Sequence, residues 1–200
     1  MKTLVFASNN AHKLEEIRSM LAGKFDVKSL SDIGCTADIP ETGTTFRQNA
    51  LQKAQYVKDY FGYDCFADDS GLQVHALGDE PGVYSARYAR MHGVDEVPTK
   101  DAANMQVLLS KLWPSAESAP DTSACFRTSI ALIYEGATHY FDGIVEGHII
   151  RDRRGSEGFG YDPIFVPRGY DQTFAELGAD IKNGISHRAR AVAKLVEFLG

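Results

Sequence analysis

The stretch Ala67-Asp68-Asp69-Ser70-Gly71 places two adjacent carboxylates directly after the apolar residues Cys65 and Phe66. Neighbouring side chains of an extended segment point to opposite faces, so only one of the two aspartates easily faces any one site. A turn at Ser70-Gly71 would let the second aspartate reach a shared metal, because glycine makes such a turn cheap. Paired carboxylates at a strand end suit Mg²⁺ or general-base chemistry. Taken alone, however, Asp-Asp-Ser-Gly is more typical of an ordinary turn.

The composition is that of an ordinary globular protein with one sizeable core and room for a lobe. The chain has 200 residues, of which 44% are hydrophobic and 24% charged, and its formal net charge is −6. Its most basic run, Arg151-Asp152-Arg153-Arg154, is short and interrupted. Nucleic acid is therefore not expected as a partner, because its binding needs a broad basic surface. A small anionic ligand bound by a few cations is compatible with this charge.

Cysteine usage and hydropathy point to the cytoplasm. Cys35, Cys65 and Cys125 lie far apart and form no C-x-x-C pair. This spacing argues against a zinc site and a disulfide framework, and it fits a reducing compartment. The apolar run in Met1–Phe6 is too short for a signal peptide, and no later run could span a bilayer. We therefore expect a cytoplasmic protein without a membrane partner.

The N-terminal segment predicts a strand, a polar turn and a helix. Residues 3–7 form a continuous apolar run, Ser8-Asn9-Asn10 favours a turn or cap, and a helix is expected over residues 11–21. Lys13 lies with Glu16 near the helix start. The pattern resembles a phosphate-binding turn, but taken alone it is more typical of a capped surface helix with an i,i+3 ion pair. Neither G-x-G-x-x-G nor the Walker pattern is present.

A loop is expected over residues 36–44, followed by a helix over residues 45–61. Thr45 and Gln48 have the spacing of a capping box at the start of this helix. Lys53 lies in line with the apolar positions of the helix. Its side chain therefore either extends along apolar surface to solvent or points into a cleft.

Long strand candidates occupy residues 124–134 and 138–150, and Glu135-Gly136 between them is typical of a hairpin. A further strand is expected over residues 27–30 and a helix over residues 100–112. Long antiparallel strands combined with strand–helix alternation predict a mixed α/β protein.

The last third contains an aromatic loop and an unusual helix start. Glycines on both sides of Phe159 leave its ring free to lie flat on a ligand such as a purine base, although aromatic glycine loops are also ordinary turns. Ser186 is a candidate N-cap for the closing helix, which places His187 and Arg188 in its first turn. Cations there oppose the helix dipole, so we expect an anion or an acceptor-rich partner beside them.

Six motifs in order closely resemble the inosine/xanthosine triphosphate pyrophosphatase family, and the resemblance extends from Leu4 to Leu199. They are Ser8-x-Asn10-x-x-Lys13-x-x-Glu16, Glu41-Thr42-Gly43-x-x-Phe46-x-x-Asn49-Ala50-x-x-Lys53-Ala54, Ala67-Asp68-Asp69-Ser70-Gly71-Leu72, Pro81-Gly82-Val83-Tyr84-Ser85-Ala86-Arg87-Tyr88, Gly158-Phe159-Gly160-Tyr161-Asp162-Pro163 and Ile185-Ser186-His187-Arg188. Each motif alone is weak. Their joint occurrence is what raises the aspartate pair above the turn interpretation.

The resemblance implies one domain over residues 1–200 with an α/β fold: an elongated mixed central β-sheet flanked by helices, in two lobes with a cleft between them. It also implies a homodimer. The implied activity is Mg²⁺-dependent hydrolysis of the purine nucleotides ITP, dITP and XTP to the monophosphate and pyrophosphate, which removes non-canonical nucleotides from the pool. Two alternatives stay open, a pyrophosphatase for other modified or pyrimidine nucleotides and a nucleotide sensor without turnover.

The resemblance also implies roles for individual residues. Glu41 and Asp69 would bind Mg²⁺, and Asp69 would activate water, with Asp68 as the alternative base. Residues that would contact the substrate are Ser8, Asn9, Asn10, Ala11, His12, Lys13, Lys53, Ser70, Phe159, Gly160, Tyr161, Asp162, Lys182, His187 and Arg188. Within this set, Phe159 would stack on the base.

The resemblance also bears on base selection and on the polar turn. His187 or Arg188 would donate to the 6-oxo group of hypoxanthine or xanthine. Guanine carries the same group, and its rejection has no visible source in the sequence. Asn9 stands where the family often has glycine, and because asparagine tolerates positive φ we expect the turn to keep its shape.

Overall fold

A computed structural model describes all residues from Met1 to Gly200. The chain forms two compact units. Unit 1 comprises Met1–Asp69, Thr128–Asp142 and Arg190–Gly200, and unit 2 comprises Ser70–Arg127 and Gly143–Ala189.

The strands form one mixed sheet of seven strands, in the order β2-β1-β3-β5-β6-β7 with β4 on β3. β1 pairs in parallel with β2 and β3, whereas the β3–β4 and β6–β7 pairs are antiparallel. The mixed α/β sheet predicted from the sequence is therefore confirmed. The bounds are β1 (Lys2–Phe6), β2 (Phe25–Lys28), β3 (Cys65–Val74), β4 (Glu80–Pro81), β5 (Ser123–Tyr134), β6 (Ala137–Ile149) and β7 (Phe165–Pro167).

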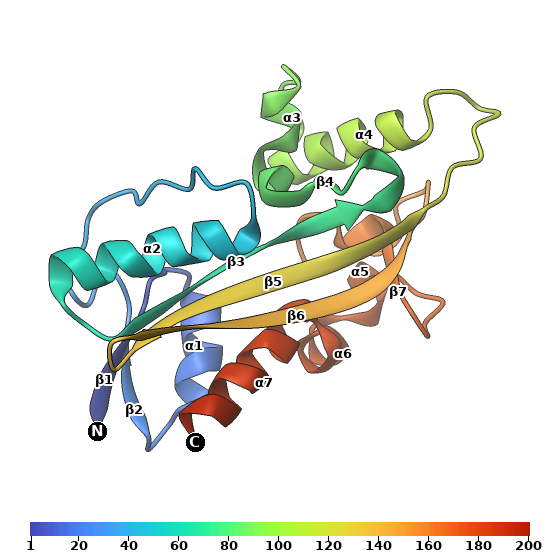
Figure 1. Ribbon diagram of the computed structural model, residues 1–200. Coiled ribbons are helices and arrows are strands. Elements are labelled where there is room, and N and C mark those ends of the chain that lie inside the picture. Colours follow the sequence, from blue (N-terminus) through green and yellow to red (C-terminus); the bar gives the residue numbers. More distant parts are fainter. The chain divides into compact units, whose positions relative to one another are not determined.

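Helices cover both faces of the strands in unit 1, as Figure 1 shows for α1 (Ala11–Met20) and α2 (Phe46–Phe61). Side chains on β1 alternate between two apolar clusters. One cluster joins Leu4 and Phe6 to residues of α1 and of α7 (His187–Leu199), and the other joins Val5 to residues of α2. The strand therefore sends successive side chains to opposite helical layers.

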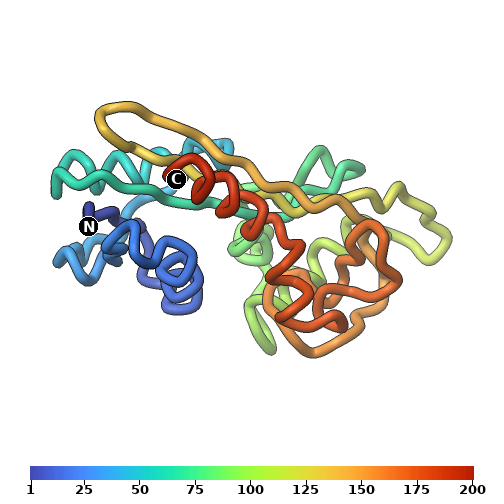
Figure 2. The backbone as a smooth tube through the Cα atoms, turned by 90° about the horizontal axis from the view of Figure 1, so that it is seen from below, coloured from blue at the N-terminus to red at the C-terminus, as the bar shows by residue number.

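The C-terminal part of α7 lies against β6 (Figure 2). The Phe198 ring lies 4.4 Å from the His139 ring and 5.5 Å from the Phe141 ring, measured between centroids. In addition, Lys194 Nζ donates to the main-chain oxygen of Asp142 at 2.5 Å. Aromatic packing and this hydrogen bond together fix the end of the chain on unit 1.

Unit 2 packs its short helices around a separate core. The largest fully buried side chains of this core include Tyr88, Leu108, Phe165 and Phe174. Its helical segments are η1 (His75–Leu77), η2 (Gly82–Arg87), α3 (Tyr88–Met91), α4 (Lys100–Leu112), η3 (Asp162–Ile164), α5 (Phe174–Leu177) and α6 (Ala179–Ile185).

Several local predictions are confirmed. The helix over residues 100–112 is α4. β5 and β6 occupy the two long strand candidates, and both Glu135 and Gly136 between them have positive φ, as a two-residue type I′ hairpin requires.

The predicted turn at Ser70-Gly71 is wrong. β3 continues through both residues, and Leu72 and Val74 are fully buried. β3 has β1, β4 and β5 as sheet neighbours, so pairing along its length overrides the local turn tendency of Asp-Asp-Ser-Gly. The two aspartates consequently lie on one continuous strand.

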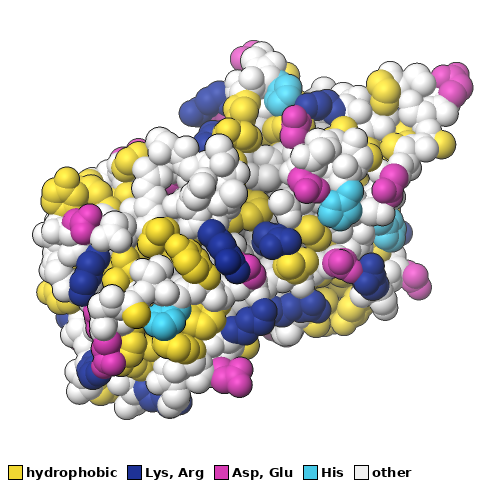
Figure 3. Space-filling view, viewed as in Figure 1, with side chains coloured by type: hydrophobic (Ala, Val, Ile, Leu, Met, Phe, Trp, Pro, Cys, Tyr) yellow, Lys and Arg dark blue, Asp and Glu magenta, His cyan; other side chains and the backbone are white.

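The surface carries both signs of charge. Dark blue and magenta side chains are interspersed on the face in Figure 3, which has no broad basic region. None of the helices is both long and apolar enough to cross a bilayer.

Candidate active site

The turn after β1 lies level with Asp68 because β1 and β3 are parallel neighbours that pair Phe6 with Phe66. The Asn10 side chain caps α1 by accepting from Lys13 N at 3.1 Å. Capping sets the direction of the helix, and Lys13 Nζ then donates to Asp68 Oδ2 at 2.7 Å. This arrangement goes beyond a capped surface helix, since Lys13 pairs with a buried carboxylate of another element.

Residues of the polar turn and of the first helical turn have different environments. Ser8 Oγ accepts from Asn10 N at 3.1 Å, while Ala11 and His12 are exposed in the first turn of α1. The N–H groups of a first helical turn have no partners within the helix, which makes this turn suited to an anion.

Asn9 does not have a positive φ, so the turn does not use the tolerance of asparagine for that conformation. Its side-chain oxygen instead accepts from both the main-chain nitrogen and the hydroxyl of Ser31, each at 2.8 Å. Asn9 therefore connects the polar turn to the segment after β2. Its side-chain oxygen is used for this structural contact, which the sequence did not indicate.

Lys53 points inward from α2. Its Nζ lies 2.6 Å from Glu41 Oε1 and 2.6 Å from the main-chain oxygen of Asp68, and its side chain is only 16% exposed. Burial lowers the pKa of Lys53, but the negative charges of Asp68 and Glu41 outweigh that effect and the pKa is raised. Of the two alternatives for Lys53, the structure rules out extension to solvent.

Asp69 lies on the α2 side of the strand. Asn49 Nδ2 donates to Asp69 Oδ2 at 3.0 Å, whereas Asp68 is bound by Lys13 from α1. The alternation expected for an extended segment is thus confirmed. Burial raises the pKa of Asp69 to about 6, while the Asn49 hydrogen bond and the Lys53 charge act in the opposite direction and Glu41 raises it further.

Two carboxylates of unit 1, those of Glu41 and Asp69, are candidate ligands for a divalent cation. No group of three or more His, Cys, Asp or Glu side chains gathers as a ready-made metal site. Mg²⁺, however, is usually bound by one or two carboxylates together with water and substrate phosphates. Glu41 and Asp69 meet that requirement in number and kind, and a cation would offset the cost of burying Asp69 in its charged form.

In unit 2 the aromatic loop surrounds a buried ion pair. Lys182 Nζ lies 2.5 Å from Asp162 Oδ2 and 4.3 Å from the centroid of the Phe159 ring, which is 62% exposed. Burial raises the pKa of Asp162, against the effect of the Lys182 charge. A Cβ at Gly158 would meet Asp162 Oδ2 at 2.1 Å, so only glycine allows this loop shape.

The loop residues next to Phe159 have structural contacts. Gly160 N donates to Asp101 Oδ2 at 2.8 Å. Tyr161 is 4% exposed and its hydroxyl donates to the main-chain oxygen of Ser85 at 2.7 Å. Its side chain therefore belongs to the core of unit 2 and does not face a ligand.

The start of α7 is as predicted, because Ser186 Oγ accepts from Ala189 N at 3.1 Å. The buried His187 ring stacks on Phe126 with 5.0 Å between centroids and 13° between planes. Arg188 follows in the first turn of the helix and is partly buried, as is Ser70 on β3.

Asn49 is the residue to which the sequence argument assigned no role. It is completely buried on the apolar side of α2, between Phe46 and Lys53 along the helix. A polar residue in that stripe was a usable signal, because a buried carboxamide needs hydrogen-bond partners.

The fold and these contacts define a mixed α/β protein that gathers lysines and carboxylates around parallel strands and presents an aromatic ring beside a paired lysine. The model of the Ham1 family matches residues 4–198. This chain therefore belongs to the Ham1 family.

Similarity to known relatives extends over the whole chain. A dITP/XTP pyrophosphatase from Porphyromonas gingivalis is 52% identical over 200 residues, covering 100% of this chain and 98% of the relative. One from Flavobacterium johnsoniae is 48% identical, covering 98% and 97%. The solved structure of a HAM1 protein from Coxiella burnetii superimposes with a TM-score of 0.89 at 38% identity, covering 100% of this chain and 98% of that one.

Proposed function

We propose that this protein is a Mg²⁺-dependent pyrophosphatase that hydrolyses ITP, dITP and XTP to the monophosphate and pyrophosphate. The observation that carries the proposal is the pairing of Lys53 with Glu41 beside the partly buried Asp69, in a chain of the Ham1 family. Its relatives over the whole chain are dITP/XTP pyrophosphatases, which supports the same activity.

In this proposal the triphosphate binds to unit 1. Lys13, Lys53 and the first turn of α1 supply positive charge, which a polyphosphate chain needs before water can approach phosphorus. Glu41 and Asp69 would hold Mg²⁺, which neutralises phosphate charge when bound. Asp69 is proposed as the water-activating group, because it lies beside the Lys53–Glu41 pair on the α2 side of β3, where Asn49 holds its carboxylate.

The base is assigned to unit 2. Phe159 is proposed to stack on the purine, because its aromatic ring is exposed. Lys182 Nζ lies over this ring, and the ion pair with Asp162 holds that lysine in place. His187 and Arg188 are proposed as donors to the 6-oxo group. Adenine has an amino group at that position. Its N–H donors would face the N–H donors of His187 or Arg188, so adenine would bind less well.

We also propose that the protein works as a homodimer in the cytoplasm. The three cysteines are buried and free of disulfides, as expected in a reducing compartment.

A panel of triphosphates with product identification tests the activity. ITP, dITP and XTP should release pyrophosphate in the presence of Mg²⁺, with far slower reaction of ATP. Orthophosphate as the product would overturn the reaction assignment, and preference for dTTP or UTP would overturn the substrate assignment. Tight binding of dITP without turnover would identify a sensor instead.

A further inference from the structure

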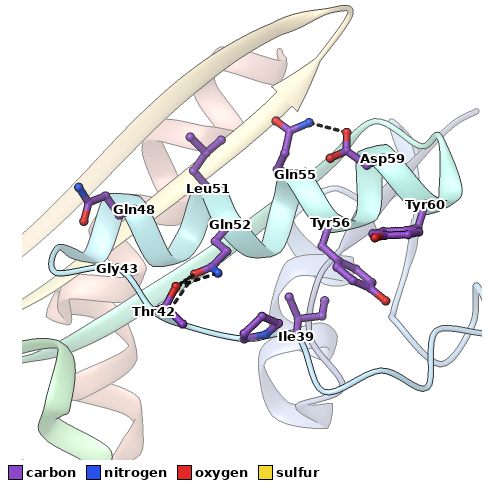
Figure 4. Close-up of a pocket in the computed structure, with 11 residues that line it drawn as sticks. Ile39, Thr42, Gly43, Gln48, Leu51, Gln52, Gln55, Tyr56, Asp59 and Tyr60 are labelled. Atoms are coloured by element: carbon purple, nitrogen blue, oxygen red, sulfur yellow. Dashed lines mark hydrogen bonds between the residues drawn. The ribbon is translucent and has the colours of Figure 1, made fainter.

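Three carboxamide side chains of α2 bind the segment that follows Glu41. Consecutive main-chain N–H groups of this segment each donate to a different carboxamide oxygen. The pairs are Thr42 N to Gln52 Oε1 at 2.9 Å, Gly43 N to Asn49 Oδ1 at 2.7 Å and Thr44 N to Gln48 Oε1 at 2.8 Å. We call Gln48, Asn49 and Gln52 the carboxamide row, and Figure 4 shows Gln52 directed at Thr42.

The position of this segment depends on the carboxamide row. None of residues 36–44 is buried, and the segment borders a groove of about 480 Å³ whose lining includes Ile39, Pro40 and Thr42. Close approach to α2 requires Gly43, since a Cβ there would lie 2.6 Å from Gln48 Cβ. Hydrogen bonds to the row, together with the Lys53–Glu41 ion pair and the packing of Ile39 on the core, therefore hold the segment that bears Glu41.

Asn49 is the member of the row that also contacts the second carboxylate. Its Oδ1 accepts from Gly43 N, two residues after Glu41, and its Nδ2 donates to Asp69 Oδ2 at 3.0 Å. Asn49 is fully buried, so neither hydrogen bond competes with bulk water. A single planar side chain thus connects the segment of Glu41 to Asp69.

We propose that Asn49 is a positioning residue that sets the geometry of the Glu41–Asp69 carboxylate pair and thereby its affinity for a divalent cation. The inference rests on the proposed function only in taking this pair as the cation site. Residues that orient ligands without touching the metal typically change metal affinity when removed.

The chain provides a matched control in Asn104. This asparagine is 2% exposed, its Oδ1 accepts from Ala89 N at 2.8 Å, and its Nδ2 donates to Ala86 O at 3.3 Å. It makes the same kind of bridge between a helix and a preceding segment, but to two main-chain groups. Asn104→Ala therefore reproduces the structural loss without disturbing the carboxylate pair.

Mn²⁺ binding to the purified full chain, followed by electron paramagnetic resonance of free Mn²⁺, gives a readout independent of turnover. Asn49→Ala is expected to weaken Mn²⁺ binding by about tenfold or more. Gln52→Ala should weaken it less, because Gln52 anchors only the loop, and Asn104→Ala should bind Mn²⁺ like the wild type. If Asn49→Ala does not fold, Asn49→Ser takes its place with the same expectation.

Wild-type Mn²⁺ affinity in a folded Asn49 variant would overturn the inference, as would an equal loss in Asn104→Ala. A wild-type chain that neither binds Mn²⁺ nor needs Mg²⁺ would overturn it too. The Mg²⁺ concentration for half-maximal pyrophosphate release from dITP provides the second measurement, and it should rise in Asn49→Ala. If the wild type binds Mn²⁺ in an Asn49-dependent manner but releases no pyrophosphate, the proposed function fails and the inference stands.

Discussion

Asp68 and Asp69 are neighbours in sequence, yet their partners differ. Asp68 is 6% exposed and paired with Lys13, which reduces its availability as a base, whereas Asp69 is bound by the neutral Asn49. The direct ion pair with Lys13 makes Asp68 the weaker candidate for water activation and Asp69 the better one.

Substitution of each aspartate separates their roles. Asp69→Asn should lower kcat for dITP by about 10²-fold or more, the usual contribution of a general base. Asp68→Asn should mainly raise KM, because Lys13 loses its charged partner. Steady-state kinetics together with circular dichroism measure both effects, and normal kcat in Asp69→Asn would refute the base assignment.

The raised pKa of Asp69 predicts a pH dependence of stability. The folded pKa of about 6 exceeds the unfolded value of about 3.9, so the folded state binds this proton more tightly. The carboxyl therefore stabilises the fold below about pH 4, and this contribution is lost as the pH rises through 6. In metal-free buffer, the stability of Asp69→Asn relative to the wild type should increase between pH 4.5 and 7.5 by up to about 2 kcal/mol. Urea unfolding at both pH values measures it, and a constant difference would contradict the burial effect.

Phe159 offers a test that leaves the fold intact. Its ring is largely exposed, and Lys182 keeps Asp162 as a partner when the ring is removed. Loss of stacking on a base costs about 1–3 kcal/mol, so Phe159→Ala should raise KM for dITP by about 5- to 150-fold. Phe159→Tyr should keep KM near the wild-type value. An unchanged KM in Phe159→Ala would place the base elsewhere.

At the scale of elements, α2 combines three tasks. It packs Ala54 and Val57 into the core of unit 1, it carries Lys53, and its carboxamide row binds the segment that bears Glu41. At its first turn, Arg47 forms two hydrogen bonds to Asp142 Oδ2, at 2.6 and 3.1 Å. Packing and polar contacts thus fix the helix on β3 and β6 together.

The close contact between α2 and the preceding segment predicts the effect of a single methyl group. Gly43→Ala should displace the segment, because the new Cβ would meet Gln48 Cβ at 2.6 Å. The Mg²⁺ concentration for half-maximal activity should therefore rise, and the midpoint of urea unfolding should fall only slightly. Gly184→Ala is the steric control, since a Cβ there meets nothing within 4 Å. Equal effects of the two substitutions on Mg²⁺ dependence would contradict the prediction.

At the scale of the whole molecule, the proposed homodimer is open to direct measurement. Sedimentation equilibrium at micromolar concentration should give twice the monomer mass. Because the chain carries a formal net charge of −6, copies repel one another at long range, and added salt should not dissociate a dimer that is held by short-range contacts. A monomer at all concentrations would refute the assembly.

Local features of the fold follow from short stretches of the sequence. Two helices begin at the caps expected from the sequence, since Thr45 and Ser186 accept from main-chain N–H groups of the first turn. Thr99 caps α4 in the same way. The hairpin at Glu135-Gly136 has the same local origin. In each case the interacting groups are within a few residues of one another, so composition and spacing suffice to predict them.

The candidate site was predicted residue by residue only through resemblance to a family. The motifs named the lysines and carboxylates, but they did not indicate that Asn49 binds both Gly43 and Asp69, or that Asn9 binds Ser31. Asn49 and Asp69 are 20 residues apart and Asn9 and Ser31 are 22 apart, so these pairs meet only when segments distant in sequence pack together. Local sequence patterns therefore do not predict these contacts.

The stretch Ala67–Gly71 separates the features that the sequence determines from those that the tertiary structure decides. By itself the sequence determined the alternation of the two aspartates, the apolar strand that leads into them and the identity of the charged residues. Only the tertiary structure decided that the strand continues past Gly71, that Lys13 binds Asp68, and that Asp69 lies with Asn49. The physical reason is that strand pairing and buried polar contacts gain their energy from residues distant in sequence, and there they outweigh local turn preference.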